Sequence, residues 1–149
     1  MQTEAAAPSG HEQRLHEIGS VRQDTARGLR RWFQNDYFDL YVWQDEGGTA
    51  IAFQLCYDRA AGEGAISWSA AAGFAHARVD TGDMPYRHRG TPLLRAAGPP
   101  PYFRIYNRFL EAAEGFDPRL RALVLERLRD YRIELFGVPR KPRRKRRRA

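Results

Sequence analysis

Basic side chains crowd into positions 139–149, which read PRKPRRKRRRA. This segment, the basic tail, holds eight cations and no acid: Arg140, Lys141, Arg143, Arg144, Lys145, Arg146, Arg147 and Arg148. Like charges at this density repel one another and bury no apolar surface, so we predict a tail that is disordered in the free protein. Such segments bind phosphate backbones by displacing condensed counterions. The tail predicts contact with nucleic acid or another polyanion, and a merely solvating role is the alternative.

The rest of the chain is nearly neutral. Residues 1–138 carry 17 basic and 18 acidic side chains, a net charge of −1, because the tail holds eight of the 25 basic residues and none of the 18 acidic ones. The formal net charge of +7 and the isoelectric point of about 10.1 therefore describe the tail rather than the domain. Both lysines lie in the tail, and the arginine- and alanine-rich remainder is typical of a bacterial gene of high GC content.

A second concentration of polar groups lies between residues 76 and 95. Its histidines and aspartates are His76, Asp80, Asp83 and His88. These residue types bind metals, but their spacing matches no zinc or calcium loop, so we expect turn formation and no metal.

Arginines in the same region carry guanidinium groups that suit phosphate or carboxylate ligands. With one histidine they form a candidate anion pocket: Arg78, Arg87, His88, Arg89 and Arg95. Ordinary solvated arginines are the simpler interpretation. A small enzyme or anionic-ligand-binding domain that uses this loop is the alternative to a pure binding protein.

Other reactive residue types have structural interpretations. Aspartates recur near predicted strand ends, at Asp36, Asp39, Asp45 and Asp58. A pair of them could perform acid–base chemistry, but such aspartates more often form turns. Cys56, the single cysteine, rules out an intrachain disulfide and lies in a strand pattern typical of a small buried residue.

Aromatic residues accompany the predicted strands, at Trp32, Phe33, Tyr41, Trp43 and Trp68. On an exposed sheet face such rings stack on nucleic-acid bases. That role requires basic neighbours, and only Arg30 and Arg31 lie close in sequence. We therefore expect core packing for these rings.

Period-two alternation predicts most of the secondary structure up to residue 97. The clearest strand is 49–58, where Phe53, Leu55 and Tyr57 alternate with smaller or polar residues. Further strands are predicted at 29–34, 39–45, 65–69, 74–79 and 93–97. The segment 15–21 fits either a short helix or a strand.

Helical periodicity follows the prolines at 99–101. A helix over 102–114 has an apolar stripe of Phe103, Tyr106, Phe109, Leu110 and Ala113. Gly115 can end it in a left-handed conformation, and Asp117-Pro118 is a typical start for a second helix over 118–136. Because the connection is short, we expect an antiparallel helix pair.

These elements predict an α+β fold, in which an antiparallel sheet of four to six strands from residues 29–97 is packed on one face by the two helices. We expect one domain over 14–138, between a disordered N-terminus at 1–13 and the basic tail. The uncovered sheet face is a candidate surface for a partner or a homodimer. No apolar stretch of membrane-spanning length and no secretory signal occur, which favours a soluble cytoplasmic protein without a membrane span. No cofactor is expected.

Three short motifs resemble those of a family of small uncharacterised bacterial proteins: Arg31-Trp32-Phe33, DLYVW at 39–43 and FQLCYD at 53–58. The similarity continues through His76 to Asp80 and through 91–94, and so covers about residues 29–97. The resemblance implies a bacterial origin and supplies no activity or catalytic residue. The sequence thus predicts a non-enzymatic binding protein that contacts a polyanion through its tail.

Overall fold

The computed structural model describes residues 13–19, 23, 28–59, 64–80, 93–96 and 98–138. Its strands are β1 (His16–Ile18), β2 (Leu29–Gln34), β3 (Phe38–Gln44), β4 (Ala50–Tyr57), β5 (Gly64–Ser69), β6 (Gly73–Asp80) and β7 (Leu93–Ala96). The helices α2 (Tyr102–Ala112) and α3 (Pro118–Phe136) come after the sheet in the chain. All seven strands form one sheet in sequence order, each antiparallel to the next.

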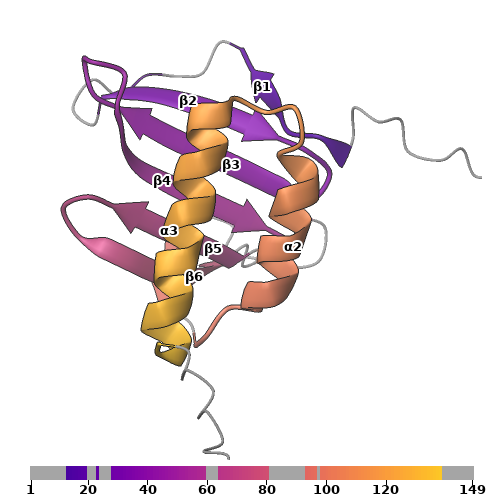
Figure 1. Cartoon of the computed structure of the whole chain (residues 1–149), viewed down its shortest axis with the longest axis vertical. Helices are drawn as coiled ribbons and strands as arrows, with labels where there is room; N and C mark the ends of the chain where they lie inside the picture. The colour runs from indigo at the N-terminus through magenta and orange to yellow at the C-terminus, as the bar shows by residue number, and fades with distance from the viewer. Residues whose placement is uncertain are drawn as a thin grey trace, which may run out of the picture.

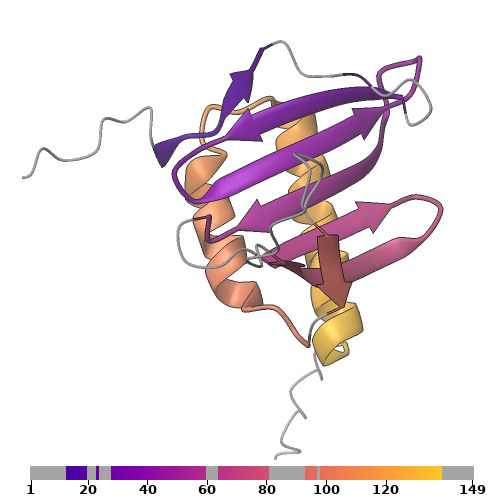
Figure 2. The ribbon, with the colours of Figure 1, turned by 180° about the vertical axis from the view of Figure 1, so that it is seen from behind.

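The α+β fold predicted from the sequence is confirmed. Six strands, β2–β7, fall within residues 29–97, at the upper end of the expected number. The segment whose structure the sequence left open contributes β1, which pairs with the outer edge of β2. The two helices run antiparallel and cover one face of the sheet (Figure 1), and the opposite face carries no helix (Figure 2).

The core lies between the sheet and the helices. Leu40, Leu55 and Ile66 are register partners on three neighbouring strands, and all are fully buried. Such a row follows from the period of two, which places alternate residues of each strand on the same face. From the helices, Ile105 and Phe109 are fully buried against these strands. Because the helices pack on this face, the opposite face of the sheet is the one that they leave uncovered.

The apolar stripe predicted for α2 is confirmed at Phe109 and Ala113, which are fully buried, and is wrong at Phe103. The buried residues of α2 are Tyr102, Ile105, Phe109 and Ala112, whereas Phe103 is 52% exposed. Both sets recur at helical spacing, so periodicity does not distinguish them. The orientation places the Tyr102 hydroxyl so that it donates to the Leu128 carbonyl of α3, and burial raises the pKa of this hydroxyl to about 12.

The start of α3 follows the sequence prediction. Asp117 is the N-cap, and its Oδ1 accepts hydrogen bonds from the backbone N–H groups of Arg119 (3.0 Å) and Leu120 (3.4 Å). Pro118 occupies the first helical position, where a missing N–H costs nothing. Gly115 has a φ of 75°, as expected for the residue that ends the preceding helix.

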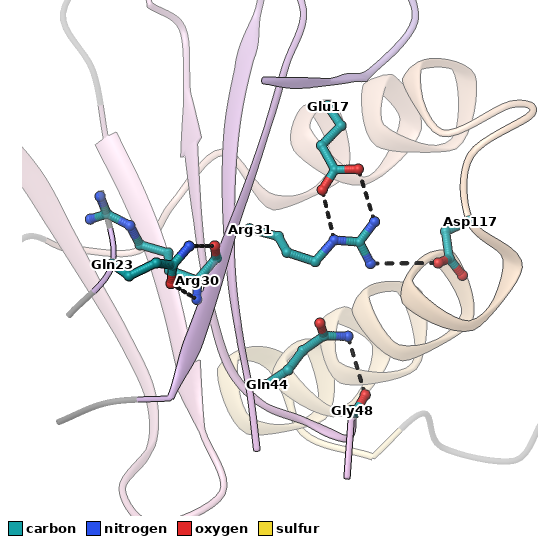
Figure 3. Close-up of polar contacts among 7 residues, drawn as sticks. All are labelled: Glu17, Gln23, Arg30, Arg31, Gln44, Gly48 and Asp117. Atoms are coloured by element: carbon teal, nitrogen blue, oxygen red, sulfur yellow. Dashed lines mark hydrogen bonds and ion pairs between the residues drawn. The ribbon is translucent and has the colours of Figure 1, made fainter. Parts of the chain in front are cut away.

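Arg31 joins the sheet edge to the start of α3 (Figure 3). Its Nε and Nη2 atoms lie 2.8 and 3.0 Å from the two carboxylate oxygens of Glu17 on β1. Its Nη1 lies 3.8 Å from Oδ2 of Asp117. The hydrogen bond from Arg31 lowers the pKa of the Glu17 carboxyl. One guanidinium thus holds β1, β2 and α3 together.

Removal of the helix cap has a predictable cost. We expect Asp117→Ala to lower the free energy of unfolding by about 1 kcal/mol, because two N–H groups lose their acceptor. Asp117→Asn is the matched control, since asparagine caps helices as well as aspartate does and loses only the distant charge contact with Arg31. Urea unfolding followed by circular dichroism measures both variants. Equal losses for the two would show that the charge, and not the cap, is responsible.

Candidate functional site

The sheet face away from the helices, called the open face, gathers aromatic and polar residues from β2 and β3. Register pairs Arg30 with Trp43, Trp32 with Tyr41, and Gln34 with Asp39. Of the intervening residues, Phe33, Leu40 and Val42 are buried on the helix side. Because paired residues share a face and neighbours along a strand alternate, these three pairs point outward.

Three rings on this face, Trp32, Tyr41 and Trp43, form what we call the aromatic wall. Trp32 and Tyr41 are stacked, with ring centroids 5.7 Å apart and planes inclined by 16°. Tyr41 and Trp43 lie 6.4 Å apart and 33° inclined. The guanidinium carbon of Arg30 lies 5.8 Å from the Tyr41 centroid. All three rings are half-buried, so part of each side chain remains accessible.

The expectation of core packing for the aromatic residues is wrong for Trp32 and Trp43, whereas the half-buried Tyr41 packs against a small buried cluster of Cys56 and Ala65. Phe33 and Trp68 are core residues, 3% and 9% exposed. The wall residues belong to the opposite alternation and lie on the face that the helices leave uncovered. Arg30 and Arg31 extend to opposite sides of β2 (Figure 3), so only Arg30 accompanies the wall.

Asp39 fixes the orientation of one end of the wall. Its Oδ1 accepts hydrogen bonds from Trp32 Nε1 (2.8 Å) and Gln34 Nε2 (2.9 Å). Its Oδ2 lies 2.9 Å from Nε of Arg59. The side chain is nearly buried, and its charge is balanced by the arginine. These donors make Asp39 a group that positions Trp32. At Asp45 the predicted turn role is confirmed, because its Oδ1 accepts from the Thr49 N–H.

Beyond the wall, the open face continues onto β4, β5 and β6. The outward residues here, called the floor, are short or flexible: Ala52, Gln54, Ser67, Ser69 and Ala75. Cys56 lies beside them and is 4% exposed, which confirms its interpretation as a small buried residue. The Gln54 amide donates to the Cys56 sulfur over 3.3 Å.

His76 points to the helix side and is held by two partners. Its Nδ1 lies 2.5 Å from the Gly98 carbonyl oxygen, and its Nε2 lies 2.7 Å from the Tyr57 hydroxyl. A carbonyl only accepts, so Nδ1 carries the proton and Nε2 accepts from Tyr57 in the neutral ring. Burial raises the pKa of the Tyr57 hydroxyl, which favours its role as donor. His76 thus joins β4, β6 and the lead into α2.

The candidate anion-pocket residues are only partly placed. Arg78 is exposed on β6, and its register partner on β7 is Arg95. Arg87, His88 and Arg89 lie outside the described residues, as do Asp83 and the whole basic tail. Within the described ranges, no three histidine, cysteine, aspartate or glutamate side chains are grouped to hold a metal ion.

A cleft of about 950 Å³ lies between the start of β1, the turn at 35–38 and the end of α2. The guanidinium of Arg108 lies 4.2 Å from the centre of the Tyr37 ring at this cleft. Its charged lining is mixed: Arg14, Asp36, Arg108, Glu111 and Glu114. With two arginines and three acids in the lining, the cleft favours neither sign of ligand. No sequence motif marks it, because its residues come from three separate segments.

Comparison with known proteins finds no matching family model, no matching curated protein and no matching solved structure. The resemblance to small bacterial proteins therefore stays a prediction. In the part of the chain that the structure describes, no helix is long and apolar enough to cross a membrane.

Proposed function

We propose that this chain is a non-enzymatic, nucleic-acid-binding protein of the bacterial cytoplasm. In this proposal the basic tail attracts the phosphate backbone, and the open face contacts the bases. The observation that carries it is the gathering of Trp32, Tyr41 and Trp43 beside Arg30 on a sheet face without helices. Proteins that bind nucleic acid without sequence preference stack bases on aromatic side chains and attract the backbone with neighbouring cations.

The charge distribution supports the same proposal. Residues 1–138 have a net charge of −1, whereas residues 139–149 hold eight cations, so attraction to a polyanion is concentrated in this short segment of the sequence. Each phosphate that a cation neutralises releases condensed counterions, and this release makes affinity depend steeply on salt. The tail thus supplies attraction without sequence preference, and any selectivity must come from the folded domain.

The alternative, an enzyme or anion-binding domain that uses the loop at 76–95, receives less support from the described residues. Both ring nitrogens of His76 are occupied by Tyr57 and Gly98, so this histidine acts as a structural link. Arg78 is exposed on the helix-side alternation of β6, away from the aromatic wall.

A salt titration tests the proposal. Fluorescence anisotropy measures the affinity of the full chain for a labelled 20-mer oligonucleotide, as duplex and as single strand, from 50 to 300 mM salt. If all eight tail cations engage, the slope of log K against log salt approaches about −7 on duplex DNA and about −6 on a single strand. A slope shallower than about −2, or no binding at 50 mM salt, contradicts the proposal.

A further inference from the structure

We infer that the helix layer docks at one end on a membrane surface that contains anionic phospholipid, a role additional to the proposed binding of nucleic acid. The residues that would enter the lipid, called the helix-end patch, are exposed and apolar: Phe103, Ile133, Phe136 and Val138. Their exposed fractions are 52%, 47%, 57% and 76%. Among the described residues, Leu29 is the only other exposed large hydrophobic side chain. Exposed apolar residues that gather at one place, rather than scatter singly, mark a contact surface.

The antiparallel helices bring the patch together (Figure 1). Phe103 is the second residue of α2 and Phe136 is the last residue of α3, so both lie at the same end of the helix pair. Their rings stack with centroids 5.6 Å apart and planes inclined by 21°. Ile133 precedes Phe136 by three residues and therefore lies beside it on α3. Val138 follows directly after the C-cap, Gly137.

Arginines flank the patch on the side of α2. The guanidinium carbon of Arg132 lies 5.2 Å from the centre of the Phe103 ring. One turn earlier, Nε of Arg129 donates a hydrogen bond of 3.1 Å to the Tyr106 hydroxyl. Both arginines are exposed. An arginine can lay its apolar stem along hydrophobic groups and keep its guanidinium in a polar layer, so these two side chains suit the boundary between acyl chains and headgroups.

The acids of this helix end are paired or lie away from α2. Asp130, three residues before Ile133, forms an ion pair with Arg127 over 3.1 Å. Glu134 comes two residues after Arg132, and a helix advances about 100° per residue, so these two lie on nearly opposite sides of α3. The positive side of the helix end is therefore the side that faces α2.

The basic tail begins directly after Val138 and holds eight cations. Polybasic segments next to an apolar anchor bind membranes that carry anionic headgroups. One apolar anchor alone gives weak and reversible binding, and stable attachment takes a second signal such as a polybasic segment. The helix-end patch and the tail supply one signal each. Because they are adjacent in the chain, both can contact the same membrane surface.

Other occupants fit the patch less well. Ile133 and Val138 have no aromatic ring to stack on a base, whereas acyl chains require none. The two phenylalanine rings already contact each other, and Phe136 also meets Tyr102 edge to face with centroids 6.1 Å apart. A twofold contact between two copies of the chain would bring the same arginines and the two basic tails together, and like charges repel.

Vesicle flotation tests the inference, with phosphatidylcholine alone and with about 30% phosphatidylglycerol, at about 100 mM salt. The full chain should bind the mixed vesicles at least about tenfold more strongly than the neutral ones, because both signals are required. Phe136→Ala should weaken binding to mixed vesicles about tenfold, and Val138→Ser about threefold, since each removes apolar surface from the lipid. Leu29→Ala, at the start of β2 and outside the patch, is the matched control and should stay within about twofold.

Four results would overturn the inference. Binding to mixed vesicles that neither Phe136→Ala nor Val138→Ser weakens would show that tail charge alone is responsible. Absence of vesicle binding overturns the membrane role and leaves the binding of nucleic acid untouched. Loss of oligonucleotide affinity in both variants, with unchanged vesicle binding, assigns the patch to nucleic acid. A dimer in sedimentation velocity that Phe136→Ala disrupts assigns it to a second copy of the chain.

Folding of the variants is checked by thermal unfolding. Val138 lies beyond α3 and is 76% exposed, so Val138→Ser should leave the melting temperature unchanged. If Phe136→Ala fails to fold, Val138→Ser carries the comparison with Leu29→Ala.

Discussion

A chain that ends at Val138 is expected to bind a duplex at least a thousandfold more weakly than the full chain at 50 mM salt. The truncation removes eight cations, and a protein that makes about 6–10 phosphate contacts has a counterion-release contribution of this size or larger at low salt. The fold should be unaffected, because the buried residues of the described structure extend no further than Tyr131 and Val138 is 76% exposed. Anisotropy and thermal unfolding measure the two quantities.

Charge and chain length can be separated in the same assay. A full-length chain with glutamine at each of the eight cationic tail positions should behave like the truncated chain, because only charge displaces counterions. Affinity within threefold of the full chain would mean that the tail does not contact the ligand.

Gly64→Ala is expected to lower the free energy of unfolding by about 2–4 kcal/mol, a large share of the roughly 5–15 kcal/mol that stabilises a domain. Gly64 lies on β5 between Tyr57 of β4 and the strand that carries His76. A Cβ added to Gly64 would lie 2.8 Å from Tyr57 Cε1 and still closer to Cζ and the hydroxyl oxygen. The tyrosine ring crosses over Gly64 to reach His76, so an alanine displaces the ring and breaks its hydrogen bond.

A double-mutant cycle tests this explanation. With Tyr57→Ala in place the obstacle is gone, and Gly64→Ala should then cost less than about 1 kcal/mol. Urea unfolding of the four proteins gives the coupling energy. If Gly64→Ala costs the same in both backgrounds, strain elsewhere in β5 must be responsible.

Local patterns predicted the elements well, because the causes of those elements are local. The alternation at 49–58 specifies a strand with one buried face, and Asp117 followed by Pro118 supplies both a cap and a fitting first residue for α3. The segment that forms β1 has no such pattern, because its strand exists through pairing with β2.

The side of each element was harder to predict. Alternation places Tyr41 and Trp43 on one face of β3, but only the position of the helices decides whether that face is core or surface. For the same reason, Phe103 was predicted to be buried in α2, where Tyr102 is the buried residue. The partners of His76 lie 19 and 22 residues away along the chain, so its role as a link between strands required the topology.

The order of elements along the chain also constrains how the molecule can be synthesised. All strands precede α2 and α3, and each pairs only with its sequence neighbours. Hairpins can therefore form one after another as the polypeptide leaves the ribosome, without closing long loops. The apolar side of the nascent sheet nevertheless stays exposed to solvent until α3 has been synthesised through Phe136. At roughly 5–20 residues per second, this delay after the last strand is a few seconds. During that interval a chaperone or a neighbouring nascent chain can reach residues that the finished domain hides completely.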